Sequence, residues 1–183
     1  MSLLRSLFDP DVLMSGVAMV RDIPRALQLK PVDGNRFFTE EKRHEYRQRI
    51  ESVTLQSARQ WGTMNVDQML HHLNLACGGS LGFYDLPDES NLATRTVGKW
   101  VIVDWLPEQP VGLRIPKGFK IPHSKRFEFA YEKTQLLKIV ETAWHARSDA
   151  AWKPHPLFGR MTPREWGKLL QMHLDYHLRQ FAA

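Results

Sequence analysis

Long segments with the repeat of about 3.6 residues that an amphipathic helix requires are the feature of this sequence that most restricts its fold. The regular alternation of apolar and polar residues that is typical of a half-buried strand is scarce. The chain has 183 residues, which suffice for one ordinary domain. Several substantial helices joined by loops in a chain of this size predict an all-α fold, a helical bundle.

The last helix has the clearest start signal in the chain. Thr162 is its predicted N-cap, Pro163 occupies the first helical position, and Glu165 completes a capping box. This helix is expected to extend to Phe181. The other helices are expected over residues 39–57 or 39–60, 65–79, 92–106 and 124–146.

Local signals also mark the ends of the other predicted helices. Asn65 and Gln68 have capping-box spacing at the start of the second helix, and the Gly78-Gly79 pair ends it. Gly62 suits the left-handed C-terminal cap of the first helix. An apolar stripe is expected on the third helix from Val97, Trp100, Val101 and Trp105.

Residues 1–35 differ from the rest of the chain, because their short apolar clusters are interrupted by three prolines. We expect an N-terminal extension here, with room for one short helix at Val12–Val20. It is expected to pack on a bundle formed by residues 36–183.

Composition excludes several classes of protein. The single cysteine, Cys77, excludes an internal disulfide and any metal site built from several cysteines. No apolar run approaches the ~20 residues that cross a bilayer. Asp9 and Asp11 precede the apolar stretch at Val12–Val20, where a signal peptide carries positive charge. These features predict a cytoplasmic protein with no membrane partner.

The net charge of +5 does not indicate a nucleic-acid partner, because the 25 basic residues are scattered among 20 acidic ones. The charges alternate in sign over residues 40–51, as on a solvated helix face. We therefore expect a solvated surface and no nucleic-acid binding.

The eight histidines indicate more about function than the net charge does. His173 and His177 lie four residues apart on the predicted last helix, so both imidazoles project from one face and can bind one metal ion at ~2.0–2.1 Å. With eight histidines in the chain, chance alone gives about a third of one such pair. The spacing therefore also allows two partly exposed histidines near a helix C-terminus, where the helix dipole favours cations.

A third ligand has to come from another helix, and the His71-His72 pair of the second helix is the obvious source. Neighbouring helical residues point about 100° apart, so only one of the two faces inward. His72 shares its face with Met69 and Ala76 and is expected to face the core, whereas His71 is expected to face water or a partner.

Three neutral imidazoles from two helices of a bundle form an open metal site, in which at least one coordination position is left for water or substrate. Such a centre lowers the pKa of a bound water to ~7 or activates a coordinated thiol as the thiolate. Histidine nitrogens suit zinc, nickel, iron and copper, so the sequence does not name the metal.

Five segments of the chain carry a family resemblance. They are Trp61-Gly62-Thr63-Met64, Gln68-Met69-Leu70-His71-His72-Leu73, His155-Pro156-Leu157-Phe158-Gly159, the helix start with Thr162, Trp166 and Gly167, and His173-x-x-x-His177-Leu178-Arg179-Gln180-Phe181. Together they resemble the DinB/YfiT-like superfamily, in a branch whose members are mostly uncharacterised. The resemblance covers residues 36–183, and its C-terminal segment is the most specific part.

The resemblance implies a DinB-like four-helix bundle that binds one divalent metal ion, often nickel, zinc or iron, through three histidines. Carried over by position, these are His72, His173 and His177. Relatives often have a second histidine directly before the last ligand, where this chain has Tyr176. This difference bears on the surroundings of the site or on a partner contact.

The resemblance further implies thiol transfer or hydrolysis of a small-molecule substrate, with a thiol among the candidates. The sequence assigns no catalytic residue and no site for an organic cofactor. The alternative is a non-catalytic, metal-stabilised bundle that acts as a dimerising or stress-response binding module, which would make the protein a homodimer.

Each remaining candidate residue has a possible structural role as well as a possible functional one. His155 either anchors its loop or approaches the site, and Gln68 either caps its helix or binds a water. Cys77 is expected to be a small buried residue. Core or loop packing is expected of Trp61, Trp144, Trp152 and Trp166.

Overall fold

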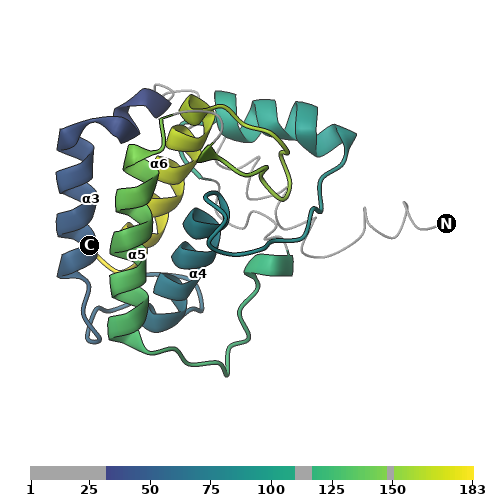
Figure 1. Ribbon diagram of the computed structural model, residues 1–183. Helices are drawn as coiled ribbons and strands as arrows, with labels where there is room; N and C mark the ends of the chain where they lie inside the picture. The colour runs from purple at the N-terminus through teal and green to yellow at the C-terminus, as the bar shows by residue number, and fades with distance from the viewer. Residues whose placement is uncertain (1–31, 110–116, 148–150) are drawn as a thin grey trace.

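The computed structural model describes residues 32–109, 117–147 and 151–183, and the fold is all-α, as predicted (Figure 1). Its α-helices in these ranges are α3 (Glu40–Ser52), α4 (Val66–Gly79), α5 (Phe129–His145) and α6 (Pro163–Gln180). Its shorter turns are the 3₁₀ helices η1 (Gly34–Phe38) and η4 (Lys117–Phe119), and the π-helical η2 (Thr94–Gly98) and η3 (Trp100–Trp105).

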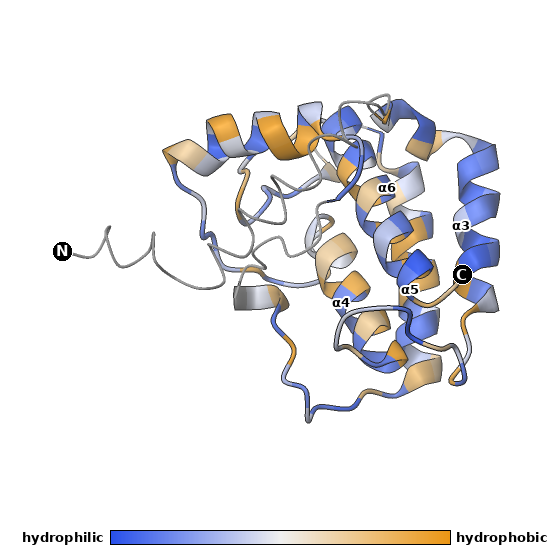
Figure 2. Cartoon of the chain, turned by 180° about the vertical axis from the view of Figure 1, so that it is seen from behind, coloured by the Kyte–Doolittle hydropathy of each residue, from blue (hydrophilic) through white to orange (hydrophobic). Residues whose placement is uncertain are grey.

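The four α-helices pack around one apolar core. Helices α5 and α6 lie between α3 and α4 and contact both of them, and η1 packs on α6 (Figure 1). Helix α3 is largely hydrophilic and most of its residues are at least partly exposed, as the alternating charges predict (Figure 2). The core between the helices includes Ile50, Leu70, Leu73, Leu136, Ile139, Leu174 and Leu178.

The predicted start of α6 is confirmed in detail. The Thr162 hydroxyl accepts a hydrogen bond from the Glu165 backbone N–H at 3.2 Å, and the Glu165 carboxylate accepts one from the Thr162 N–H at 2.6 Å. The predicted bounds of α4 are also confirmed, and the Asn65 N–H donates to the Gln68 side-chain oxygen at 2.9 Å. Both helices start where reciprocal caps satisfy backbone donors that have no partner within the helix.

Two other predicted bounds are wrong. Helix α3 ends at Ser52, because Val53 turns to extended backbone and the Ser57 hydroxyl closes a local turn with the Thr54 N–H. Helix α5 begins at Phe129 instead of residue 124, because the Glu128 carboxylate caps it by accepting the first free backbone N–H groups.

The predicted third helix exists, but its expected apolar stripe is wrong. The segment winds as a π-helix, with i to i−5 hydrogen bonds such as that from the Leu106 N–H to the Val101 carbonyl. The residues chosen for the stripe are not buried against the core. Val97 and Trp100 are 64% and 60% exposed, and the segment buries Ile102 and Val103 instead. The ribbon of this segment is largely apolar in colour in Figure 2.

Most of the predicted N-terminal extension, including the expected helix at Val12–Val20, lies outside the described residues. Within the ranges that the structure describes, every helix is too short or too polar to span a lipid bilayer.

Candidate metal centre

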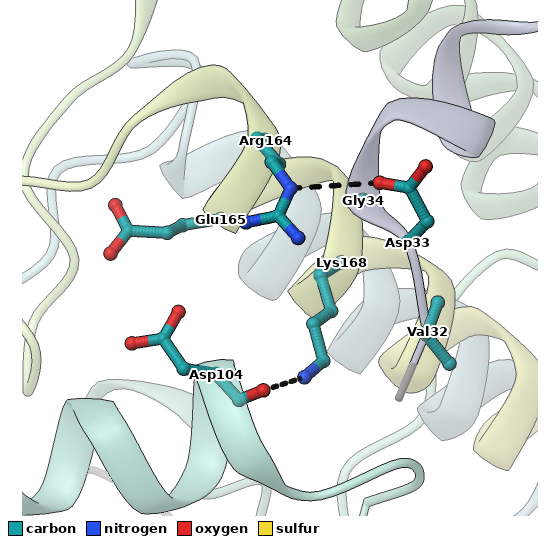
Figure 3. A pocket seen from close by; sticks show the side chains of 7 residues that line it. All are labelled: Val32, Asp33, Gly34, Asp104, Arg164, Glu165 and Lys168. Carbon is teal, nitrogen blue, oxygen red and sulfur yellow. Dashed lines mark hydrogen bonds and ion pairs between the residues drawn. The ribbon is translucent and has the colours of Figure 1, made fainter. Parts of the chain in front are cut away.

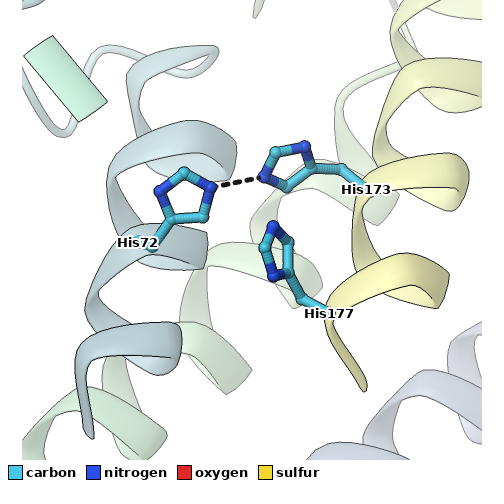
Figure 4. A group of neighbouring side chains, drawn as sticks. All are labelled: His72, His173 and His177. Atoms are coloured by element: carbon cyan, nitrogen blue, oxygen red, sulfur yellow. Dashed lines mark hydrogen bonds between the residues drawn. The ribbon is translucent and has the colours of Figure 1, made fainter. Parts of the chain in front are cut away.

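Two helices carry the three predicted ligands. His173 and His177 lie one turn apart on α6 and face α4, which supplies His72 from its own inner face (Figure 4). Helix α6 begins at the Thr162 capping box and runs unbroken through both histidines, which helical spacing places on one face.

The three imidazoles converge on one point. One ring nitrogen from each residue lies within 4.8 Å of the other two. The Nε2 atoms of His72 and His173 are 3.1 Å apart, and the ring centroids of His72 and His177 are 4.8 Å apart. Tetrahedral bonds of ~2.0–2.1 Å would set ligand nitrogens about 3.3–3.4 Å apart, so small side-chain movements bring this set to that geometry.

All three histidines are held in the neutral form. Burial lowers the pKa of His72 from 6.5 to about 4 and that of His177 from 6.5 to about 3. Burial, together with the neighbouring His177 and His72, also lowers the pKa of His173 well below its ordinary value. Neutral imidazole is the form that binds a metal, so these residues need not lose a proton at neutral pH to act as ligands.

The outer nitrogens of two of these rings face hydrogen-bond acceptors. The Nδ1 atom of His72 lies 3.4 Å from the backbone carbonyl of Phe119, and Nδ1 of His177 lies 3.0 Å from the Gln180 side-chain oxygen. Contacts of this kind orient the ligands of metal sites. The sequence reasoning missed both of them. Gln180 was detectable because it follows His177 by three residues and so shares its helix face.

The expectation that His71 faces water or a partner is wrong. Its Nδ1 lies 3.0 Å from the carboxylate of Glu132, which is buried on α5, and its ring stacks on Phe127 with centroids 3.8 Å apart. The side-chain amide of Asn74 donates to the same carboxylate at 2.7 Å. This face of α4 packs against α5, so a polar network occupies the position where the sequence suggested solvent.

His155 and Gln68 both make the structural contacts expected of them, and His155 also lies close enough to His173 to contribute to lowering the pKa of His173. The His155 Nδ1 accepts hydrogen bonds from the backbone N–H groups of Leu157 and Phe158 at 3.0 and 3.2 Å, so this histidine anchors its own loop. Gln68 caps α4, and its amide donates to the carbonyl of Lys125 at 2.8 Å.

The cysteine and the tryptophans also occupy packing positions. Cys77 is buried, and burial raises the pKa of its thiol to about 12, which leaves it unreactive at neutral pH. Trp152 and Trp166 stack with centroids 5.5 Å apart, and Trp144 donates its indole N–H to the Thr39 carbonyl. Trp61 is 37% exposed and contacts Tyr176 edge to face, beside the centre.

A separate polar cavity of about 150 Å³ opens at the start of α6 (Figure 3). Its cationic side chains already have partners. Lys168 donates to the Asp104 carbonyl at 2.6 Å, and Arg164 lies 3.6 Å from the Asp33 carboxylate. The cavity is lined by Val32, Asp33, Gly34, Asp104, Arg164, Glu165 and Lys168, so none of the three converging histidines faces it.

Comparison with known proteins identifies a family for this chain. A protein-family model described as "Protein of unknown function (DUF1569)" matches residues 36–183, which include all three histidines. The curated proteins and the solved structures give no match.

Proposed function

Given that the chain belongs to the DUF1569 family, we propose that it is a metalloprotein whose single divalent ion is held by His72, His173 and His177. One observation carries this proposal: three imidazoles from two helices present ring nitrogens within 4.8 Å of one another. The metal is nickel, zinc or iron, all of which accept imidazole nitrogen.

The chemistry of the donor set supports a metal ion at this point. His72 faces the Phe119 carbonyl through Nδ1, so its Nε2 presents a lone pair to the Nε2 of His173. In the metal-free protein, His173 has to place a proton between the two atoms to avoid repulsion of lone pairs. A metal ion satisfies both nitrogens, and the third imidazole, at the same time.

We further propose that the family is a DinB-like branch and that the centre is catalytic. A divalent ion held by three protein ligands keeps an open position and acidifies a bound water or thiol. This chemistry supports thiol transfer or hydrolysis of a small-molecule substrate. The contribution of the chain is to hold three neutral imidazoles in place before the metal or the substrate arrives.

The first experiment is elemental analysis of untagged protein purified without chelator, beside two histidine variants. We expect about one equivalent of metal in the wild type and none in His173→Ala. His44 lies exposed on α3, so His44→Ala is the matched control and should retain the metal. Equal metal contents in all three proteins, or no uptake of zinc, nickel or iron(II) by the wild type, would contradict the proposal.

A second candidate function is a metal-stabilised binding module without turnover. The observation that favours it is the burial of two ligands, because His72 and His177 are only 2% and 4% exposed. Assays of the metal-loaded protein with thiol acceptors and hydrolysable esters distinguish the two functions. Turnover that is lost in His173→Ala supports the enzyme. A stable dimer in sedimentation together with no turnover supports the module.

A further inference from the structure

We infer that Gln180 is a positioning residue that fixes the tautomer of His177, and that the Trp61-Gly62 turn is shaped to hold the Gln180 amide. The function that we assign to this contact rests on the proposed metal centre. The contacts that carry the inference are all between protein atoms.

The orientation of the Gln180 amide follows from its two neighbours. One end of the amide lies 2.7 Å from the backbone carbonyl of Trp61, and a carbonyl oxygen can only accept a hydrogen bond. The amide nitrogen therefore faces Trp61 and donates to it. The amide oxygen then faces His177, 3.0 Å from Nδ1.

This orientation determines which nitrogen of His177 carries the proton. The Gln180 oxygen is an acceptor, so Nδ1 of His177 has to be the donor, and Nε2 keeps its lone pair. Figure 4 shows the other nitrogen of His177 directed toward His72 and His173. Gln180 is 3% exposed, so water has little room to replace its oxygen if the side chain is removed.

Gly62 allows the amide to occupy this position. Its φ of +80° lies in the left-handed region, and a Cβ atom at this residue would lie 2.4 Å from the Gln180 side-chain nitrogen. The Gln60 N–H also donates to the Gln180 backbone carbonyl at 2.8 Å. Residues 60–62 thus hold both the main chain and the side chain of Gln180. The left-handed glycine expected as a helix cap serves this contact instead, since α3 has already ended at Ser52.

Of the two acceptors that face the Nδ1 atoms of His72 and His177, the Gln180 side chain is the one that a substitution can remove. His72 faces a backbone carbonyl, that of Phe119, which no substitution deletes. His177 depends on a side chain. Loss of this contact leaves the His177 ring free to place its proton on Nε2, where it blocks the lone pair that the metal needs.

The test compares Gln180→Met with Gln171→Met. Gln171 is a buried amide on the same helix that donates to the Asp33 and Gly167 carbonyls, away from the histidines, so its variant controls for loss of a buried amide. The ¹⁵N shifts of the imidazole nitrogens in metal-free protein report the tautomer of His177. Competition with a chelator reports zinc affinity. We expect the Nδ1–H tautomer in the wild type and in Gln171→Met. Gln180→Met should show Nε2–H and about 10–100-fold weaker zinc binding.

A second pair of variants leaves Gln180 in place. Gly62→Ala should displace the amide and reproduce the altered tautomer. Gly82→Ala should not, because Gly82 has the same φ of +80° but faces only the side chain of Lys153. An unchanged Nδ1–H tautomer in folded Gln180→Met or Gly62→Ala overturns the inference. Failure of the wild type to bind zinc, nickel and iron(II) refutes the metal centre instead, and the tautomer measurement still decides the role of Gln180.

Discussion

At the scale of single residues, the site consists of buried bases that the fold keeps uncharged. His72 and His177 are almost fully buried, and this burial lowers their pKa values from 6.5 to about 4 and about 3. Desolvation disfavours the protonated imidazole. The free energy of unfolding therefore falls at low pH, where these histidines are protonated in the unfolded chain and neutral in the folded protein.

We therefore expect the metal-free protein to lose stability as the pH falls from 6.5 toward 4. In this window the unfolded chain carries protons on His72 and His177 and the folded protein does not. Each histidine contributes a slope of at most about 1.4 kcal/mol per pH unit to the free energy of unfolding. Urea denaturation at pH values of about 7, 6 and 5 measures this slope.

Paired carboxylates do not obscure the measurement. Hydrogen bonds from Arg43 lower the pKa of Glu141 below its ordinary 4.5, so the stability that this group contributes is lost only at still lower pH. Equal free energies of unfolding at about pH 7 and about pH 5 would contradict the neutral, buried state of the histidines.

At the scale of elements, a reciprocal capping box defines the start of α6, the helix that carries His173 and His177. We expect Thr162→Ala to lower the free energy of unfolding by about 1 kcal/mol, because the Glu165 backbone N–H loses the hydroxyl that accepts its hydrogen bond. The metal content should not change, since His173 lies well inside the helix. Denaturant unfolding and elemental analysis of the same preparation test both statements.

Thr142→Ala is the matched control for this prediction. Thr142 lies within α5, and its hydroxyl donates to the Lys138 carbonyl of its own helix at 2.8 Å. Its loss should change stability much less than loss of the cap. A control variant that is destabilised as strongly as Thr162→Ala would show that the cap has no special role.

How far the sequence predicts an element depends on where its stabilising contacts lie. Helices α4 and α6 are correctly bounded because their caps are local, within three or four residues of the helix start. The π-helical winding of Thr94–Gly98 and Trp100–Trp105 has no such local marker, and a search for a period of 3.6 residues does not distinguish it from an α-helix.

The same distinction applies to the candidate site. His173 and His177 were predictable as a pair because helical spacing alone puts them on one face. The contact of His72 with the Phe119 carbonyl was not predictable, because every residue has a backbone carbonyl and the sequence does not indicate which one lies nearby. The partner of His71 was missed since Glu132 lies on α5, far along the chain.

At the scale of the whole molecule, the site joins two helices that are not consecutive in the chain. Helix α5 follows α4 and precedes α6, yet the ligands come from α4 and α6, which contact each other on one side of the bundle. A metal ion bound to His72 and His173 therefore links distant parts of the chain in the folded state alone.

We accordingly expect added metal to raise the melting temperature of the wild type and of His44→Ala, but not that of His173→Ala. Binding to the folded state alone stabilises it by about 2.7 kcal/mol when free metal exceeds the dissociation constant about 100-fold. Thermal unfolding with and without zinc measures the shift. A shift of the same size in His173→Ala would place the stabilising ion elsewhere.

The neighbouring contacts of His71 and His72 restrict how α4 can rotate about its axis. One histidine is held by Glu132 of α5 and the next is directed toward His173 of α6, so turning the helix to improve either contact weakens the other. We expect this torsional stiffness to make the size of the ion matter. If the proposed ion binds, we expect a larger radius to displace His72 and, through α4, the contact of His71 with Glu132. Selectivity among divalent ions is then expected to depend in part on a helix face that carries no ligand.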